Sequence, residues 1–279
     1  MKTFLTTIFL CLIQIISAQE NEIYANGVFG FEEHKTQRIF TDQTRIRQAP
    51  SLNAAVIDSL NSNHQVLILK KEETVLQLGE RAANWYRISY QKNQNAAEGY
   101  IWGGNLAIRF RNTNGCDFLF GITKTEDKTD KKFNQKYRQN IASIKMLKDG
   151  RLTDEVSFET GSGESLSYAG FTIESNHRLK NVELTLKATV SGEACGIAGY
   201  DQYILLTDKK LIALPQLMNV GDADVYYHTE EFIFPNDKGG IPNAFIYKME
   251  EMEKDEKERE KFKRSSKTYL WNGNSFKAK

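Results

Sequence analysis

Short runs of alternating hydrophobic and polar residues recur along most of the chain, with turn-forming residues between them. This alternation is typical of half-buried β-strands. In the C-terminal part the strand-like runs are residues 141–147, 155–160, 167–174, 182–190, 203–207, 211–214 and 225–234. Hairpin signals such as Asp149-Gly150 and Asn272-Gly273 accompany them. The pattern predicts a mostly β protein in which residues 116–279 form a larger antiparallel domain, either a sandwich or an extended sheet.

One segment near the C-terminus departs from this pattern. Residues 247–264 are rich in Glu, Lys and Arg, which are good helix formers. Acidic residues stand four positions before basic ones at three places: Glu250 and Lys254, Glu253 and Lys257, and Glu260 and Arg264. Because this spacing and order stabilise a helix, we expect one charged helix here, docked by its first turns at Met249 and Met252.

The N-terminus has the layout of a secretory signal peptide. Lys2 precedes an apolar run over residues 4–16, and the small residues Ser17 and Ala18 follow. The run is shorter than the roughly 20 residues that a membrane-spanning helix needs. We therefore predict cleavage after Ala18, a polar lead-in over residues 19–38, and a soluble, exported chain that is periplasmic or secreted, without a transmembrane segment after processing.

Residues 39–110 form a compact block of short β-prone runs and polar turns, as in a small barrel. Its successive elements are Thr44-Arg45-Ile46-Arg47-Gln48-Ala49-Pro50, residues 56–69, Asn84-Trp85-Tyr86-Arg87-Ile88, and residues 98–106, which include Gly99-Tyr100-Ile101-Trp102. In order and spacing they resemble the bacterial SH3 (SH3b) domain, over residues 39–108 only. The turn Asn61-Ser62-Asn63 stands where the family usually has a glycine, and asparagine also tolerates the left-handed conformation.

The resemblance implies a module of the cell envelope that contacts peptidoglycan or an envelope protein or peptide. Aromatic residues can line the groove of such modules, and the candidates here are Tyr86, Tyr90, Tyr100 and Trp102. Strand alternation places Trp85 and Arg87 on one face, and Tyr86 and Ile88 on the other. The alternative for these rings is a place in the barrel core.

Two cysteines, Cys116 and Cys195, remain after removal of the signal peptide. In an oxidising compartment two thiols in one chain predict a disulfide, and two free buried thiols are the alternative. The four histidines, His34, His64, His177 and His228, lie too far apart for a helical metal motif. With 37 basic and 36 acidic residues the chain has no basic field for nucleic acid. We expect no metal, cofactor or nucleic-acid partner.

These observations favour an exported, non-catalytic binding protein whose SH3-like barrel contacts an envelope ligand. SH3b modules often accompany peptidoglycan hydrolases, so a hydrolase with its active site in the C-terminal domain is one alternative. A structural or interaction protein, with the barrel packed on its neighbour, is the other.

Overall fold

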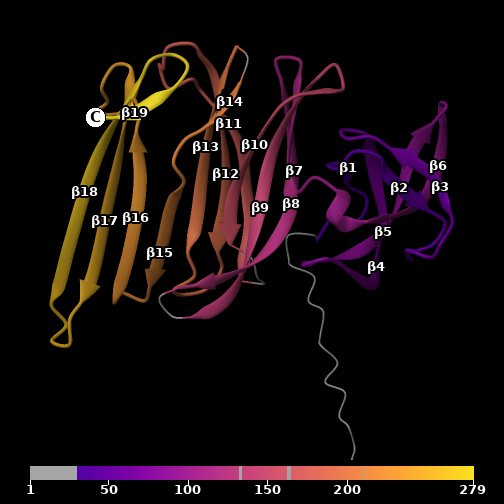
Figure 1. Cartoon of the computed structure of the whole chain (residues 1–279), viewed down its shortest axis with the longest axis horizontal. Coiled ribbons are helices and arrows are strands. Elements are labelled where there is room, and N and C mark those ends of the chain that lie inside the picture. Colours follow the sequence, from indigo (N-terminus) through magenta and orange to yellow (C-terminus); the bar gives the residue numbers. More distant parts are fainter. Residues whose placement is uncertain (1–29, 132–133, 162–164, 209) are drawn as a thin grey trace, which may run out of the picture.

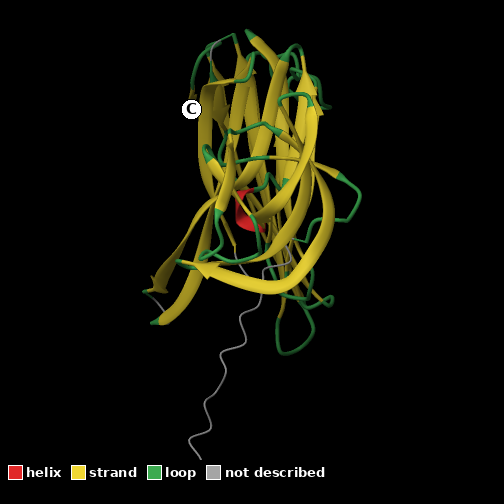
Figure 2. Cartoon of the chain, turned by 90° about the vertical axis from the view of Figure 1, so that its right-hand side faces the viewer, coloured by secondary structure: helices red, strands yellow, loops and turns green. Residues whose placement is uncertain are grey.

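The structure is a computed structural model that describes residues 30–131, 134–161, 165–208 and 210–279. The predicted signal peptide and the first part of the lead-in lie outside the described residues. Within this part of the chain strands dominate, and the helical structure consists of the short 3-10 turn η2 (Gly103–Asn105), as Figure 2 shows. No helix of the described residues is long and apolar enough to cross a membrane.

The first sheet is a curved, six-stranded half-barrel, which we call the barrel. Its strands are β1 (Thr36–Arg38), β2 (Thr44–Arg47), β3 (Val56–Leu60), β4 (Gln65–Leu78), β5 (Arg81–Lys92) and β6 (Asn95–Trp102), in the order β1-β4-β5-β6-β2-β3. Its core contains fully buried side chains from different strands, such as Ile46 of β2, Ile68 of β4 and Ile88 of β5. Asn63, in the turn before β4, has a left-handed φ of 69°, which is why asparagine can replace the glycine of the family.

Two further antiparallel sheets form the larger part of the protein. The second sheet contains β7 (Arg109–Thr113), β8 (Cys116–Asp130), β9 (Gln135–Lys148) and β10 (Arg151–Gly161). The third contains β11 (Leu166–Glu174), β12 (Val182–Gly192), β13 (Gly199–Thr207), β14 (Leu211–Ala213), β15 (Leu217–Asp222), β16 (Tyr226–Ile233), β17 (Ala244–Lys254), β18 (Glu260–Trp271) and β19 (Phe276–Ala278). Each strand-like run predicted in this part of the chain is a strand, which confirms the mostly β prediction.

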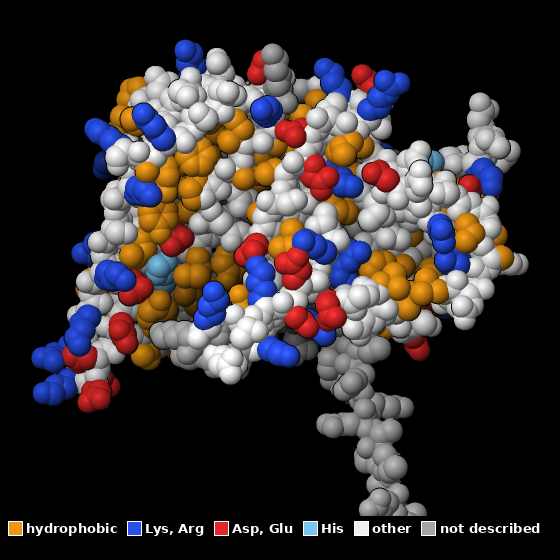
Figure 3. All heavy atoms as spheres, in the orientation of Figure 1, with side chains coloured by type: hydrophobic (Ala, Val, Ile, Leu, Met, Phe, Trp, Pro, Cys, Tyr) orange, Lys and Arg blue, Asp and Glu red, His pale blue; other side chains and the backbone are white. Residues whose placement is uncertain are grey.

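The second and third sheets pack face to face over part of their area. β7 lies against β11 and β10 against β14, and Phe120 contacts Phe171 at 5.6 Å between ring centroids. The third sheet then continues through β15 to β19 at the end of the molecule far from the barrel (Figure 1). A second hydrophobic cluster forms there around Phe232, Phe234 and Phe245, and Figure 3 shows hydrophobic side chains gathered over β16 and its neighbours. The C-terminal part is therefore both a sandwich and an extended sheet.

The barrel is docked on the second sheet through buried contacts. Phe40 packs with Leu119 and Leu147 in a small cluster that joins the two units. Lys145, itself buried, donates from Nζ to the Phe40 carbonyl at 3.0 Å and lies 4.7 Å from the centre of the Phe40 ring. Gly121 makes room for this ring, because a Cβ there would come within 2.7 Å of it. Apolar packing and a buried charged donor thus both hold the barrel in place.

The prediction of a charged helix near the C-terminus is wrong. Residues 247–264 lie in the hairpin that β17 and β18 form together with their connecting turn. The acidic and basic side chains pair across the strands and not along a helix: Arg264 Nε lies 2.5 Å from Glu250 Oε2, directly opposite in the register. Burial of Phe245 and Met252, together with cross-strand pairing, outweighs the intrinsic helix propensity of the segment.

The predicted bridge between Cys116 and Cys195 is not formed, because both cysteines are free. Cys116 is half-buried at the start of β8, in the second sheet. Cys195 is exposed in the connection between β12 and β13, in the third sheet. The topology that separates these positions could not be read from the number of cysteines alone.

Candidate functional site

A groove of about 300 Å³ lies on the barrel beside β2, β5 and β6. Its lining residues come from the turn before β2, from β2 and the connection that follows it, from the end of β4, from the strands that carry the two tryptophans, and from η2. They are Thr41, Asp42, Gln43, Thr44, Arg45, Arg47, Leu52, Leu78, Trp85, Trp102 and Asn105. Aromatic and aliphatic side chains therefore line the same groove as charged and polar ones.

Trp85 and Trp102 stand directly opposite one another on β5 and β6, and both line the groove. They are only 2% and 3% exposed. The Trp102 indole Nε1 donates to the carbonyls of Leu76 at 3.0 Å and Ala83 at 3.2 Å. The Arg81 guanidinium lies 5.0 Å from the centre of the Trp102 ring. These contacts fix the indole, so the groove has a preformed aromatic base.

Two arginines of β2 line the groove in different ways. Arg47 donates from Nη1 to the carbonyls of Leu52 and Ala54, each at 2.7 Å, and so holds the turn between β2 and β3 in place. Arg45 is exposed and forms no ion pair with an acidic side chain of the described residues. Asp42 is also exposed, so the groove presents one cationic and one anionic group that a ligand can reach.

The four aromatic residues expected in the groove separate into two pairs. Tyr86 and Tyr90 point into the barrel and are buried; the Tyr86 hydroxyl accepts a hydrogen bond from the backbone N–H of Phe31 at 3.1 Å. Burial, together with Asp58, raises the pKa of Tyr90 to about 12. Neither tyrosine lines the groove.

The other pair, Tyr100 and Trp102, lies on the opposite strand face. Trp102 lines the groove, and half-buried Tyr100 stands directly opposite both Arg47 and Arg87 in the register. Trp85 also pairs with Trp102, and Tyr86 with Ile101, so the predicted alternation of Trp85 and Arg87 against Tyr86 and Ile88 is confirmed.

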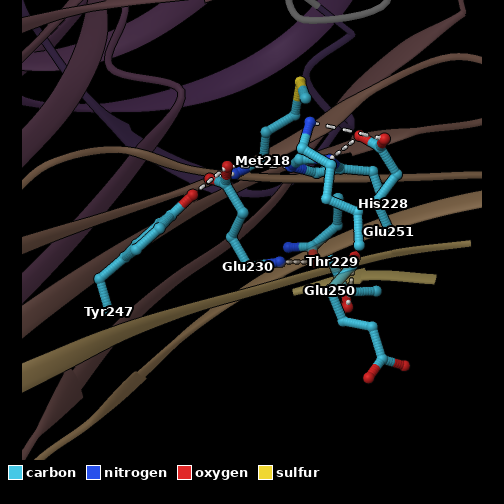
Figure 4. A network of polar contacts seen from close by, with 9 residues as sticks. Met218, His228, Thr229, Glu230, Tyr247, Glu250 and Glu251 are labelled. Atoms are coloured by element: carbon cyan, nitrogen blue, oxygen red, sulfur yellow. Dashed lines mark hydrogen bonds and ion pairs between the residues drawn. The ribbon is translucent and has the colours of Figure 1, made fainter. Parts of the chain in front are cut away.

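A polar cluster in the third sheet was missed from the sequence. His228 lies between two carboxylates, with Nε2 at 2.9 Å from Glu230 and Nδ1 at 3.2 Å from Glu251 (Figure 4). The Tyr247 hydroxyl donates to Glu230 at 2.6 Å, and the Met218 N–H donates to the same carboxylate at 2.8 Å.

Burial opposes the charged form of His228, but the hydrogen bonds with Glu230 and Glu251 outweigh it and raise the pKa of the imidazole. Since both ring nitrogens face carboxylates, the doubly protonated ring satisfies both contacts. The closeness of His228 and Glu230 was visible in the sequence, because only one residue separates them. Glu251 was not, because it falls in the segment for which we expected a helix.

The side chains that could ligate a metal are dispersed over the described ranges. There, no three or more His, Cys, Asp and Glu side chains are grouped closely enough to hold a metal ion. The contacts of Glu230 and Glu251 with His228, Tyr247 and the backbone give the polar cluster a structural explanation.

Comparison with known families bears on the barrel alone. Residues 42–107 match the family model of the bacterial SH3 domain, which confirms the resemblance seen in the sequence, and the rest of the chain matches no family. No curated protein and no solved structure matches the chain. Arg45, Trp85 and Trp102 all lie within the matched segment.

Proposed function

We propose that the protein is exported and that its barrel binds a ligand of the cell envelope, the peptide part of peptidoglycan or a related peptide, in the groove over Trp85 and Trp102. Bacterial SH3 domains commonly bind peptidoglycan, and they are typical of secreted and envelope proteins. The observation that carries the proposal is an exposed arginine, Arg45, beside a preformed aromatic base.

The charges of the groove favour a peptide with free ionic groups. A guanidinium binds a carboxylate through two parallel hydrogen bonds, and Arg45 is available for such a contact. Asp42 lines the same groove and can accept from an ammonium group. Cell-wall peptides carry both kinds of group, whereas an uncharged ligand would leave both side chains without a partner.

The aromatic residues supply apolar contact area, but in a different form from the one expected from the sequence. Trp102 and Trp85 offer only a small accessible area, since both rings are almost fully buried. Leu52 is exposed and lines the same groove. The contact with a ligand therefore combines a narrow apolar strip with the ionic contacts of Arg45 and Asp42.

One observation favours a second, structural role. The barrel is attached to the second sheet by Asn63 Nδ2, 2.7 Å from Asp117 Oδ2, and by Arg81 Nη1, 2.8 Å from the Ile122 carbonyl. These contacts agree with a barrel that stabilises its neighbour. The side chains in these contacts do not line the groove, although Arg81 also lies over the ring of Trp102, which does. Docking of the barrel and ligand binding are therefore compatible.

The groove is tested by charge reversal at Arg45. Arg45→Glu is titrated with a soluble cell-wall stem peptide by calorimetry, and Arg111→Glu, at an exposed site of β7, serves as the control. We expect the affinity for the peptide to fall by at least about tenfold, or about 1.4 kcal/mol, in Arg45→Glu alone. Equal affinities of the two variants would refute the groove as the binding site.

A further inference from the structure

A second hollow, of about 470 Å³, lies in the third sheet, far along the chain from the barrel. It is framed by the end of β12, the start of β13, and the strands β15 and β16. The connection over residues 193–198 closes one side, where the Gly196 N–H donates to the Gly221 carbonyl at 2.9 Å. The hollow is therefore part of the folded sheet and not a gap between loops.

The lining of this hollow combines apolar groups, from Val190, Ala194, Ile197 and Val220, with polar ones and is almost uncharged. Its hydroxyl, amide and aromatic groups come from Thr189, Ser191, Tyr200, Asn219, Tyr227 and Thr229. Asp201 is the ionisable carboxylate among the lining residues, and it is already engaged: Thr189 Oγ1 donates to it at 2.6 Å and Lys187 Nζ lies 3.0 Å away. Such a lining suits a neutral ligand with many hydroxyl groups and provides no free cation for a phosphate or carboxylate.

Two tyrosines give the hollow apolar surface as well as hydroxyl groups. Burial raises the pKa of Tyr200, so its hydroxyl remains neutral. The Tyr227 hydroxyl donates to Glu250, which holds the side chain in position. An aromatic ring packs against the C–H face of a sugar, while hydroxyl and amide groups hydrogen-bond with its rim.

A neighbouring hollow of about 540 Å³ lies on β16, β17 and β18 and is charged, since Glu231, Lys248, Glu250 and Arg264 line it. Thr229 lines both hollows, and in the register it stands opposite Glu250, which stands opposite Arg264. The row crosses two inter-strand steps of about 4.8 Å each. Glu250 and Arg264 are paired with each other, with Arg264 Nε 2.5 Å from Glu250 Oε2. The almost uncharged lining therefore ends at Thr229.

We propose that the first hollow, a groove from Tyr200 to Thr229, binds a neutral saccharide chain. The site belongs to the C-terminal part of the protein, for which no family match exists, and it does not rest on the function proposed for the barrel. A peptide is disfavoured because the first hollow offers no free charged group. Oligosaccharide binding is thus a separate activity that would give the protein a second point of attachment.

Gly221 permits a test that fills the site without removing any of its contacts. A Cβ at Gly221 would meet no atom within 4 Å, and its backbone does not have the left-handed φ that requires glycine. Gly221→Leu therefore places an isobutyl group in the hollow with little strain. Thr172→Leu, at an exposed position of β11, is the matched control for an added apolar side chain on the same sheet.

The full chain and both variants are titrated by calorimetry with tetrasaccharides of N-acetylglucosamine, glucose and xylose. We expect at least one of them to bind, Gly221→Leu to weaken that binding by about tenfold or more, and Thr172→Leu to leave it unchanged. If Gly221→Leu does not fold, Thr229→Ala takes its place and should weaken binding about threefold or more.

Three results would overturn the proposal. The first is that none of the three tetrasaccharides binds. The second is that the wild type and Gly221→Leu bind a tetrasaccharide equally well. The third is that the wild type binds short peptides and no saccharide, and that Gly221→Leu abolishes the peptide binding. Arg45→Glu leaves this groove intact and should bind saccharide as the wild type does. Saccharide binding by that variant therefore tests the third sheet independently of the function proposed for the barrel.

Discussion

Replacing Trp102 by Ala should destabilise the protein strongly, whatever its effect on a ligand. The indole is 3% exposed, so the change removes a large buried side chain and leaves a cavity. Truncation of a buried tryptophan or phenylalanine to alanine costs about 3–5 kcal/mol. The carbonyls of Leu76 and Ala83 also lose their common donor, and Arg81 loses the ring over which it lies.

These losses overlap, because the same ring makes all the contacts, so we expect a total of about 4 kcal/mol. Against a typical unfolding free energy of about 5–15 kcal/mol, this is a large fraction. Tyr100→Ala is the matched control on the same strand: its side chain is only half-buried, so its truncation should cost about 1 kcal/mol.

The assay is urea unfolding of the wild type and both variants, followed by circular dichroism and by calorimetry, with the slope of the transition checked for constancy. A loss below about 1.5 kcal/mol for Trp102→Ala, or a loss equal to that of Tyr100→Ala, would refute the description of Trp102 as a packed base of the groove.

Three further predictions concern other parts of the fold. The raised pKa of His228 means that its stabilising effect is complete below the unfolded pKa of about 6.5 and is lost as the pH rises through the folded pKa. The stability difference between wild type and His228→Gln, measured by urea unfolding, should therefore shrink from about pH 5.5 to about pH 8.5, and a constant difference would contradict this. Cys195 is exposed and Cys116 half-buried, so a thiol reagent should modify Cys195 first under native conditions; the absence of reaction at both would contradict free thiols. Lys145→Met removes the charged donor to the Phe40 carbonyl and leaves it the Ser62 hydroxyl at 3.2 Å, which should cost about 1–3 kcal/mol by thermal unfolding, whereas an unchanged transition would show that the Lys145 contact does not hold the barrel.

The β character of the chain could be predicted because hydrophobic alternation and turn residues are local signals. Asp149 and Gly150 both have left-handed φ values, 51° and 72°, at the turn between β9 and β10, as the sequence indicated. The charged segment could not be predicted, because its cross-strand partners decide its conformation. Glu250 meets Arg264 across the hairpin, and no local rule reveals that register.

The candidate site was predicted only in part. The alternation of β5 placed Trp85 and Tyr86 on opposite faces, but not which face was interior. Both faces of this strand prove to be buried near Trp85, because the 3-10 turn η2 and the second sheet cover the barrel there. Arg45 was not predicted as a site residue, because its exposure beside the two tryptophans depends on the folding of β2 against β6.

The central claim is that the barrel attaches the protein to the cell wall through the groove at Arg45. The most direct measurement is co-sedimentation with purified cell-wall sacculi of Gly221→Leu, in which the hollow of the third sheet is filled, alone and combined with Arg45→Glu or with Arg111→Glu. If the groove at Arg45 is the point of attachment, Gly221→Leu and its combination with Arg111→Glu sediment with the sacculi, while its combination with Arg45→Glu remains in the supernatant. Sedimentation of all three to the same extent, or of none, would contradict the claim.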